Sequence, residues 1–150
     1  MRWRFIEQDD LNWILASAKD MFKESEWSNE LEYDPEKIKQ YFFSAISNPD
    51  VFGIISLDEK EKPIGFLTGM LLDYNFSNGR FGREMDLYVV PSKRGGMTAV
   101  QMMKKFIEWC KGNGAKEVYF EPSREVKKDF DAMAKRLDME NISNVYRRKL

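Results

Sequence analysis

Residues 84–121 read EMDLYVVPSKRGGMTAVQMMKKFIEWCKGNGAKEVYFE, and they are the most informative part of the sequence about its fold. An apolar strand at 84–90 runs into a turn that contains Pro91 and then into a loop at 94–99. The loop opens an amphipathic helix, whose apolar residues recur at the spacing of one helical face, and a further strand follows at 118–121. A strand, a loop, a helix and a second strand in this order are typical of an α/β protein.

The loop at 94–99, Arg-Gly-Gly-Met-Thr-Ala, lies where the helix begins. The first backbone amides of a helix have no partner within it, and together with the helix dipole they favour an anion there. Gly95 and Gly96 would let a ligand approach the backbone closely. The loop lacks the GK[ST] of a nucleoside-triphosphate site and the GxGxxG spacing of a dinucleotide site. It is therefore either a phosphate-binding loop of another kind or a structural strand-to-helix turn.

The composition limits the class of protein. The chain has 150 residues, 43% of them hydrophobic, which suits one domain spanning 1–150 around a single core. Twenty-four basic and 25 acidic side chains leave a net charge of −1, so neither nucleic acid nor a membrane is expected as a partner. Uncharged runs such as 40–49 are far shorter than the ~20 residues that span a bilayer. No secretory leader is visible and a single cysteine fits a reducing compartment, so a cytoplasmic location is expected.

The absence of histidine excludes several kinds of chemistry. Ser-His-Asp and Cys-His nucleophilic sites both need that residue. Zinc sites with histidine ligands are excluded too, and a lone cysteine cannot form a four-cysteine site. Catalysis would therefore rest on carboxylates, tyrosines, lysines, backbone dipoles or a bound cofactor, and no metal is expected.

Hydrophobic spacing and turn signals predict the remaining elements. Asp34-Pro35 is a strong helix start, because the aspartate can cap the helix and proline fits its first turn. The charged turn at 58–63 joins two apolar runs into a hairpin. The order β-α-α-β-β-β-α-β-α-β follows, with strands at 3–6, 51–57, 64–72, 83–90, 118–121 and 142–150, and with a last helix capped by Ser123. This order predicts an α/β (α+β layered) domain with a mixed sheet.

The block at 84–121 resembles the acyl-CoA-binding core of the GNAT N-acetyltransferases. That family shows a strand ending in V-x-P, then [Q/R]-x-x-G-x-[G/A], then a helix and a strand. Val89-Val90-Pro91 and the loop at 94–99 stand in those places, with Met97 where the family usually has glycine. The predicted element order is also that of the family, and the tail resembles its closing segment. The Arg-Gly-Gly-x-x-Ala form of the loop resembles phage-encoded members.

The resemblance implies the GNAT fold, a mixed central sheet with helices on both faces. It also implies an enzyme that moves an acetyl group from acetyl-CoA, as co-substrate, to a primary amine by direct transfer in a ternary complex. The pantetheine arm would lie along Leu87, Tyr88, Val89 and Val90, and the pyrophosphate on Arg94, Gly95, Gly96, Met97, Thr98 and Ala99. The Met97 amide can serve a phosphate if its side chain points away from the ligand. The acceptor would be a small-molecule or protein amine. Whether the chain forms a homodimer is left open by the resemblance.

Two carboxylates are the candidates for proton transfer. Glu84 and Asp86 alternate with apolar residues, so both should lie on one face of the strand with Tyr88. In an acetyltransferase one of them would take the proton of the amine as general base, and Glu84 is preferred because the family's bases often lie that far upstream. Otherwise they are ordinary acids near a strand start.

The proton donor for the leaving thiolate is less clearly marked. The family's tyrosine on the last helix corresponds to Ala134 here. Tyr146, Tyr119 or Tyr88 could replace it, or water could, and Tyr146 is the candidate named for the site.

Two alternatives to an enzyme stay open. One is a GNAT-fold module that binds CoA or a protein partner without catalysis, which Met97 and Ala134 favour. The other is an α/β adaptor domain without a ligand, in which the glycine loop is only structural.

Overall fold

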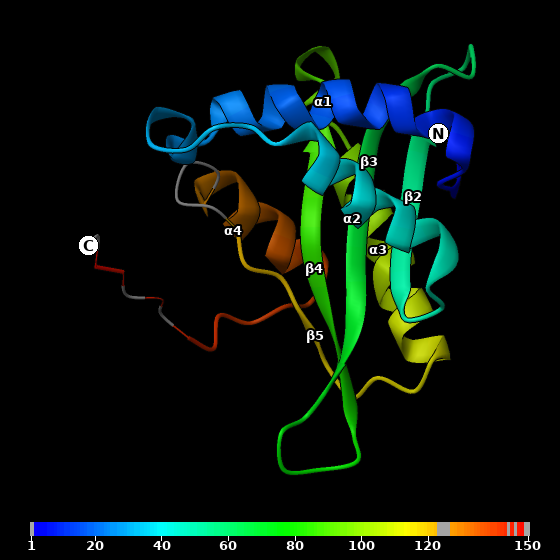
Figure 1. Ribbon diagram of the computed structural model, residues 1–150. Coiled ribbons are helices and arrows are strands. Elements are labelled where there is room, and N and C mark those ends of the chain that lie inside the picture. The colour runs from blue at the N-terminus through cyan, green and yellow to red at the C-terminus, as the bar shows by residue number, and fades with distance from the viewer. Residues whose placement is uncertain (1, 123–126, 144, 146, 149–150) are drawn as a thin grey trace.

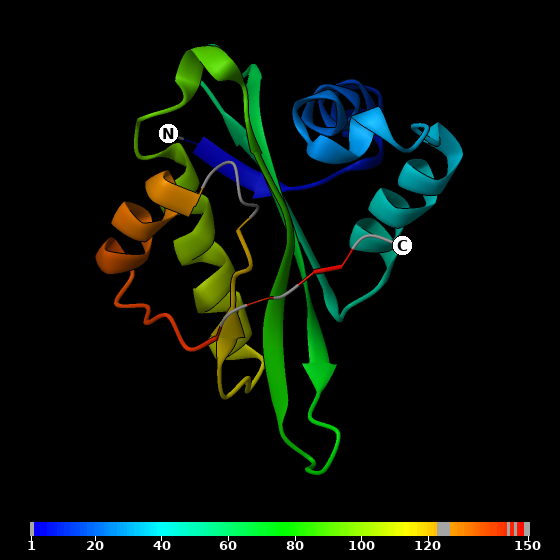
Figure 2. The ribbon, with the colours of Figure 1, turned by 90° about the vertical axis from the view of Figure 1, so that its left-hand side faces the viewer.

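The computed structural model describes residues 2–122, 127–143, 145 and 147–148. The strands are β1 (Arg2–Phe5), β2 (Val51–Leu57), β3 (Pro63–Asp73), β4 (Arg80–Val89) and β5 (Val118–Tyr119), and the helices are α1 (Leu11–Glu24), α2 (Pro35–Ser47), α3 (Thr98–Gly112) and α4 (Lys127–Arg136). The strands form one sheet in the order β1-β2-β3-β4-β5, antiparallel except that β5 runs parallel to β4. Helices α1 and α2 lie on one face of this sheet and α3 and α4 on the other (Figures 1 and 2). The predicted α/β class with a mixed sheet is confirmed.

Local signals in the sequence account for several boundaries. The Asp34 side chain caps α2 by accepting hydrogen bonds from the amides of Glu36 and Lys37, both at 3.0 Å. The β2–β3 turn is held by Asp58, whose carboxylate accepts from the amides of Lys60 and Lys62 at 2.8 and 2.9 Å. These contacts satisfy backbone groups that would otherwise have no partner at a helix start and a tight turn. The predicted helix start and hairpin are therefore confirmed.

Two predicted boundaries differ from the structure. Strand β4 begins at Arg80, earlier than expected, because the turn before it is short and closes with a hydrogen bond from the Tyr74 amide to the Gly79 carbonyl. The expected strand at 142–150 is wrong for the described residues 142, 143, 145, 147 and 148, none of which lies in a strand. Ile142 and Val145 are 62% and 71% exposed there, so the apolar side chains that suggested a strand bury little surface. The predicted cap Ser123 lies outside the described residues.

The core has two layers, one on each face of the sheet. The layer under α1 and α2 is built from the buried residues Ile6, Leu11, Ile14, Ala18, Phe42, Ile55, Leu57, Phe66 and Tyr88. The layer under α3 contains Phe52, Ile54, Leu67, Leu71, Val89, Met102, Met103, Phe106 and Cys110, and Phe130, Met133 and Leu137 of the α4 region pack against it. Strands β2 to β4 therefore contribute apolar residues to both layers, as a sheet covered on both faces requires.

Gly69 sets how closely α3 approaches the sheet. A Cβ atom at this position would lie 2.5 Å from the Phe106 ring and 2.9 Å from the carbonyl oxygen of Arg83. The ring is fully buried and the carbonyl belongs to the backbone of β4, so neither can move aside at low cost.

We expect Gly69→Ala to lower the free energy of unfolding by about 1–3 kcal/mol. Chemical denaturation of the native chain and the variant measures this. The control is Gly112→Ala, because a Cβ at Gly112 meets no atom within 4 Å. Equal stability of Gly69→Ala and the native chain would show that Phe106 and β4 are not packed as described.

Candidate active site

Strands β4 and β5 stay paired over a very short length. Their ladder consists of Gly82 opposite Val118 and Arg83 opposite Tyr119, and the two strands then diverge (Figure 1). Beyond Arg83, the edge of β4 that faces away from β3 has no strand partner among the described residues. The predicted pantetheine segment, Leu87 to Val90, lies on this unpaired part of β4 and the residue after it.

A β-bulge lies where the two strands separate. Thr68 pairs with Asp86 and Gly69 pairs with Glu84, so Met85 is an extra residue in β4. A bulge interrupts the two-residue alternation of side chains. Glu84 and Asp86 were expected to share a strand face because of that alternation. With Met85 inserted between them as the bulge residue, the bulge geometry sets how close the two carboxylates lie.

The loop after β4 presents a run of free backbone amides. It comprises a short 3-10 turn, Pro91–Lys93, followed by Gly95, whose φ of 78° is a conformation that favours glycine. From Gly95 to Val100, no backbone amide makes a hydrogen bond of normal geometry to a backbone carbonyl of the described residues. The next amide, of Gln101, donates to the carbonyl of Met97, the N-cap residue of α3. The structure therefore places an uninterrupted set of donors at the start of a fifteen-residue helix, which is the arrangement that binds anions.

Arg94 holds this loop against α1. Its Nε donates to the Val89 carbonyl at 2.8 Å, its guanidinium pairs with Glu24 at 2.8 Å, and it lies over the Tyr88 ring. Glu24 is the last residue of α1. The guanidinium is thus engaged with β4 and α1, so Arg94 can order the loop without using its charge on a ligand.

Met97 contacts α4. Arg136 donates to the Met97 sulfur at 3.2 Å, and the methionine side chain is 44% exposed. This contact brings a cation from the end of α4 to the start of α3. Arg136 was not singled out from the sequence, because nothing local shows that α4 ends beside the loop.

Glu84 and Asp86 are both partly buried at the bulge. The Glu84 carboxylate lies near the segment after β5, where the backbone of Glu121 acts to lower its pKa. Burial, followed by the negative charge of Asp86, raises the pKa of Glu84 to about 8. Burial also raises the pKa of Asp86, although the hydroxyl groups of Tyr41 and Thr68 act in the opposite direction. The two carboxylates therefore share one partly desolvated site, where both cannot easily carry a charge at once.

Tyr41 and Thr68 complete this cluster. The Tyr41 hydroxyl of α2 lies 2.8 Å from Thr68 Oγ1, and Thr68 donates to Asp86 Oδ2 at 3.2 Å. Sequence reasoning missed both residues as part of the site. Tyr41 reads only as a buried position of a helix, and Thr68 as a polar residue inside an apolar strand.

Three tyrosines were considered as proton donors, and the two that the structure describes do not lie at the bulge. The Tyr119 hydroxyl donates to Glu117 at 2.5 Å, and the Tyr88 ring is buried, stacked against Phe66. Tyr146 lies outside the described residues.

A prediction of pH-dependent stability follows from Glu84. Its pKa is about 8 in the folded chain against 4.5 for the ordinary group, so the folded state binds more protons between these values. Stability therefore falls as the pH rises from about 4.5 to 8. Glutamine cannot ionise, so we expect Glu84→Gln to be more stable than the native chain at pH 9 by roughly 2–4 kcal/mol, and to show little of this difference at pH 4.

Urea denaturation across this pH range measures the effect. The control is Glu59→Gln, at an exposed position of the β2–β3 turn. Stability curves of Glu84→Gln and the native chain that stay parallel from pH 4 to pH 9 would contradict the burial of this carboxylate.

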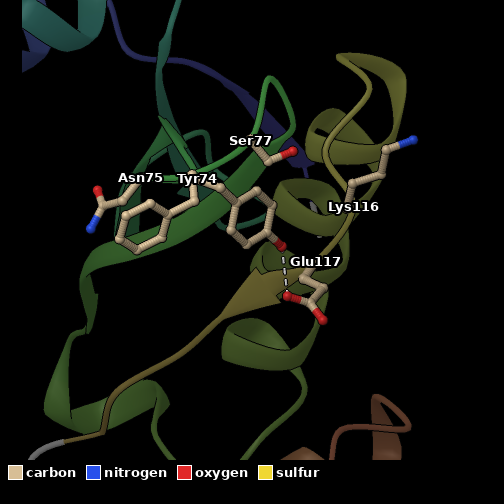
Figure 3. A pocket seen from close by; sticks show the side chains of 6 residues that line it. Tyr74, Asn75, Ser77, Lys116 and Glu117 are labelled. Atoms are coloured by element: carbon tan, nitrogen blue, oxygen red, sulfur yellow. Dashed lines mark hydrogen bonds between the residues drawn. The ribbon is translucent and has the colours of Figure 1, made fainter.

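A surface hollow lies away from the bulge, at the β3–β4 turn (Figure 3). It is lined by Tyr74, Asn75, Phe76, Ser77, Lys116 and Glu117. Glu117 accepts hydrogen bonds from both the Tyr74 and the Tyr119 hydroxyls, at 2.6 and 2.5 Å. Two of its polar groups, those of Tyr74 and Glu117, thus bond each other, and none of the residues predicted for the site lines it.

Two further features are absent from the part of the chain that the structure describes. No group of three or more histidine, cysteine or acidic side chains there could hold a metal ion. No helix there has the length and apolar character needed to cross a bilayer.

Comparison with known proteins bears on the family. The sequence model of one family, described as the acetyltransferase (GNAT) family, matches residues 16–137. No curated protein matches the chain. Many solved structures share its fold, among them a tetramutant of a Bacillus halodurans protein, with a TM-score of 0.83, 15% identity and 100% of both chains covered.

Two further structures have functional descriptions. One is a Clostridium acetobutylicum protein described as a predicted acetyltransferase and solved with acetyl-CoA (TM-score 0.76, 15% identity, 99% of this chain and 95% of that chain). The other is an aminoglycoside acetyltransferase from an uncultured soil metagenomic sample in complex with sisomicin (TM-score 0.73, 16% identity, 99% and 95% covered). At these identities the likeness shows a shared fold.

Proposed function

This chain belongs to the acetyltransferase (GNAT) family, and from that premise we propose that it transfers an acetyl group from acetyl-CoA to a primary amine. One observation carries the proposal. A run of free loop amides, an unpaired strand edge and a pair of carboxylates follow one another along β4 and the loop. These are the parts needed to hold a phosphate, to align an extended arm and to accept a proton.

The residues present fit the nucleotide end of acetyl-CoA. Its pyrophosphate would accept hydrogen bonds from the amides between Gly95 and Val100, with the helix dipole of α3 adding favourable charge. Arg136 would add a cation beside the loop. The amide edge of Leu87 to Val90 would bind the pantetheine arm as a strand binds its neighbour. The Met97 side chain would stay clear of the ligand by keeping its contact with Arg136.

The carboxylates at the bulge would activate the amine. An alkylamine is protonated at neutral pH, and only its neutral form is a nucleophile. Glu84 or Asp86 would take one proton from the ammonium group, and the nitrogen lone pair would attack the thioester carbon. The C–N bond then forms, the C–S bond breaks, and the departing thiolate takes the second proton of the amine. Tyr146 stays the candidate that passes this proton on.

We place the reaction in the cytoplasm, which a single buried cysteine favours. The acceptor is a small-molecule or protein amine. A homodimer is compatible with the exposed apolar side chains but is not needed for the chemistry.

The test is acetyl-CoA binding by calorimetry, followed by release of free CoA in the presence of a panel of amines. We expect micromolar binding and acetyl transfer to at least one amine. A folded chain that binds neither acetyl-CoA nor CoA would contradict the proposal.

A second candidate is a module that binds CoA without catalysis. Ala134, at the place of the family's usual tyrosine, favours it. Binding of acetyl-CoA without turnover of any protein or small-molecule amine would support this candidate over the enzyme.

A further inference from the structure

Two hydroxyl groups from different elements converge on one of the two carboxylates. Tyr41 comes from α2 and Thr68 from the middle of β3, while Asp86 lies opposite Thr68 on β4. Thr68 is fully buried, so its hydroxyl can bond only to neighbouring protein groups. The chain of contacts, Tyr41 to Thr68 at 2.8 Å and Thr68 to Asp86 at 3.2 Å, is therefore part of the fixed interior.

The direction of these hydrogen bonds follows from the carboxylate end. Thr68 has one hydroxyl proton and donates it to Asp86 Oδ2. In the bond between the two hydroxyls Tyr41 is therefore the donor and Thr68 Oγ1 the acceptor. An ionised carboxylate accepts hydrogen bonds and cannot donate them, so this chain of donors favours the charged form of Asp86.

Glu84 has different partners. The backbone of Glu121 acts to lower the pKa of Glu84, and besides Asp86 the charged groups that influence it are Arg83 and Glu121. Arg83 is itself paired with Glu121, so its positive charge stabilises an ionised Glu84 less. Around Asp86, the other titratable groups that face it are Glu84 and Tyr41. If the site holds one negative charge, the hydroxyl chain places that charge on Asp86 and leaves the proton on Glu84.

We propose that Tyr41 is a positioning residue which, through Thr68, keeps Asp86 ionised and oriented, so that Asp86 rather than Glu84 accepts the proton of the amine. This inference rests on the proposed acetyl transfer and goes beyond it by assigning the proton acceptor. In the reaction, Asp86 gains a proton as the ammonium group becomes a neutral amine, and later releases it to solvent. Tyr41 and Thr68 gain and lose no proton overall.

The experiment uses Tyr41→Phe and Thr68→Val, each of which removes one hydroxyl and keeps the shape of the side chain. Carbon-13 NMR of the carboxyl groups gives the pKa of Asp86 directly and needs no substrate. The matched control is Tyr74→Phe, which also removes a tyrosine hydroxyl that donates to a carboxylate, but at the far end of the β3–β4 hairpin (Figure 3).

We expect the pKa of Asp86 to rise by about one unit in Tyr41→Phe and Thr68→Val, and to stay unchanged in Tyr74→Phe. The acid limb of the kcat–pH profile should shift toward higher pH by the same amount. On the acid limb, at pH values below the pKa of Asp86, kcat should fall about tenfold in Tyr41→Phe and recover toward the native value at high pH, while the KM for acetyl-CoA stays the same. A purely structural role would lower kcat equally at all pH values and leave the Asp86 titration in place.

An Asp86 titration that is unchanged in both variants would overturn the inference. A shifted titration without a matching shift of the kcat profile would overturn the role of Asp86 as proton acceptor. Failure of the native chain to bind acetyl-CoA would overturn the proposed function and the acceptor role with it. The titrations would then still decide whether Tyr41 and Thr68 hold Asp86 ionised, so the two failures are distinguishable.

Discussion

Asp86→Asn is expected to lower kcat by about two to four orders of magnitude, which is the usual contribution of a general base. The substitution removes the basic oxygen and keeps the size of the side chain. The amide oxygen of asparagine can still accept the hydrogen bond from Thr68, so the cluster should keep its shape. Binding of acetyl-CoA should be unchanged, because the loop amides lie beyond the other end of β4.

Glu84→Gln is the matched control for this prediction, since it makes the same chemical change two residues away. Its pKa of about 8 means that Glu84 is mostly protonated at pH 7, so glutamine replaces a group that is already uncharged. We expect a change in kcat of less than about tenfold at neutral pH. Steady-state release of CoA measures both variants. A larger loss in Glu84→Gln than in Asp86→Asn would identify Glu84 as the base.

The second large effect is expected at the loop. Gly96→Val should weaken acetyl-CoA binding by about 100-fold or more, equivalent to roughly 2.8 kcal/mol. A Cβ at Gly96 would meet only the Lys93 carbonyl, at 3.8 Å, which is an ordinary contact. The protein therefore has room for a side chain there, and the added methyl groups would occupy the space in front of the loop amides where phosphate must approach.

Gly112→Val is the matched control for the loop variant. It introduces the same side chain into open space at the other end of α3. We expect both variants to unfold at about the native denaturant concentration and only Gly96→Val to lose binding in calorimetry. Native affinity in Gly96→Val would show that the ligand does not lie on this loop, and with it the assignment of Gly95 to Ala99 would fail.

Much of the fold could be read from local patterns. The cap at Asp34, the hairpin around Asp58 and the strand-loop-helix of 84–112 depend on neighbours within a few residues, and all are present in the structure. The C-terminal segment was mispredicted in its described part, because alternation shows that a strand could form but not that a sheet edge and a buried face are available to it.

The family, the mixed α/β fold and the position of the candidate phosphate loop could all be inferred from the amino-acid order. The loop could be located because a helix start with glycine before it presents free amides whatever surrounds it. The pairing of the charged and hydroxyl groups, in contrast, depends on how distant elements pack. The partner of Arg94 is Glu24, seventy residues away, and Asp86 meets Thr68 and Tyr41 across two other elements. Ionisation of a carboxylate depends on burial and on such distant partners, so the division of roles between Glu84 and Asp86 emerges only when α2, β3 and β4 pack together.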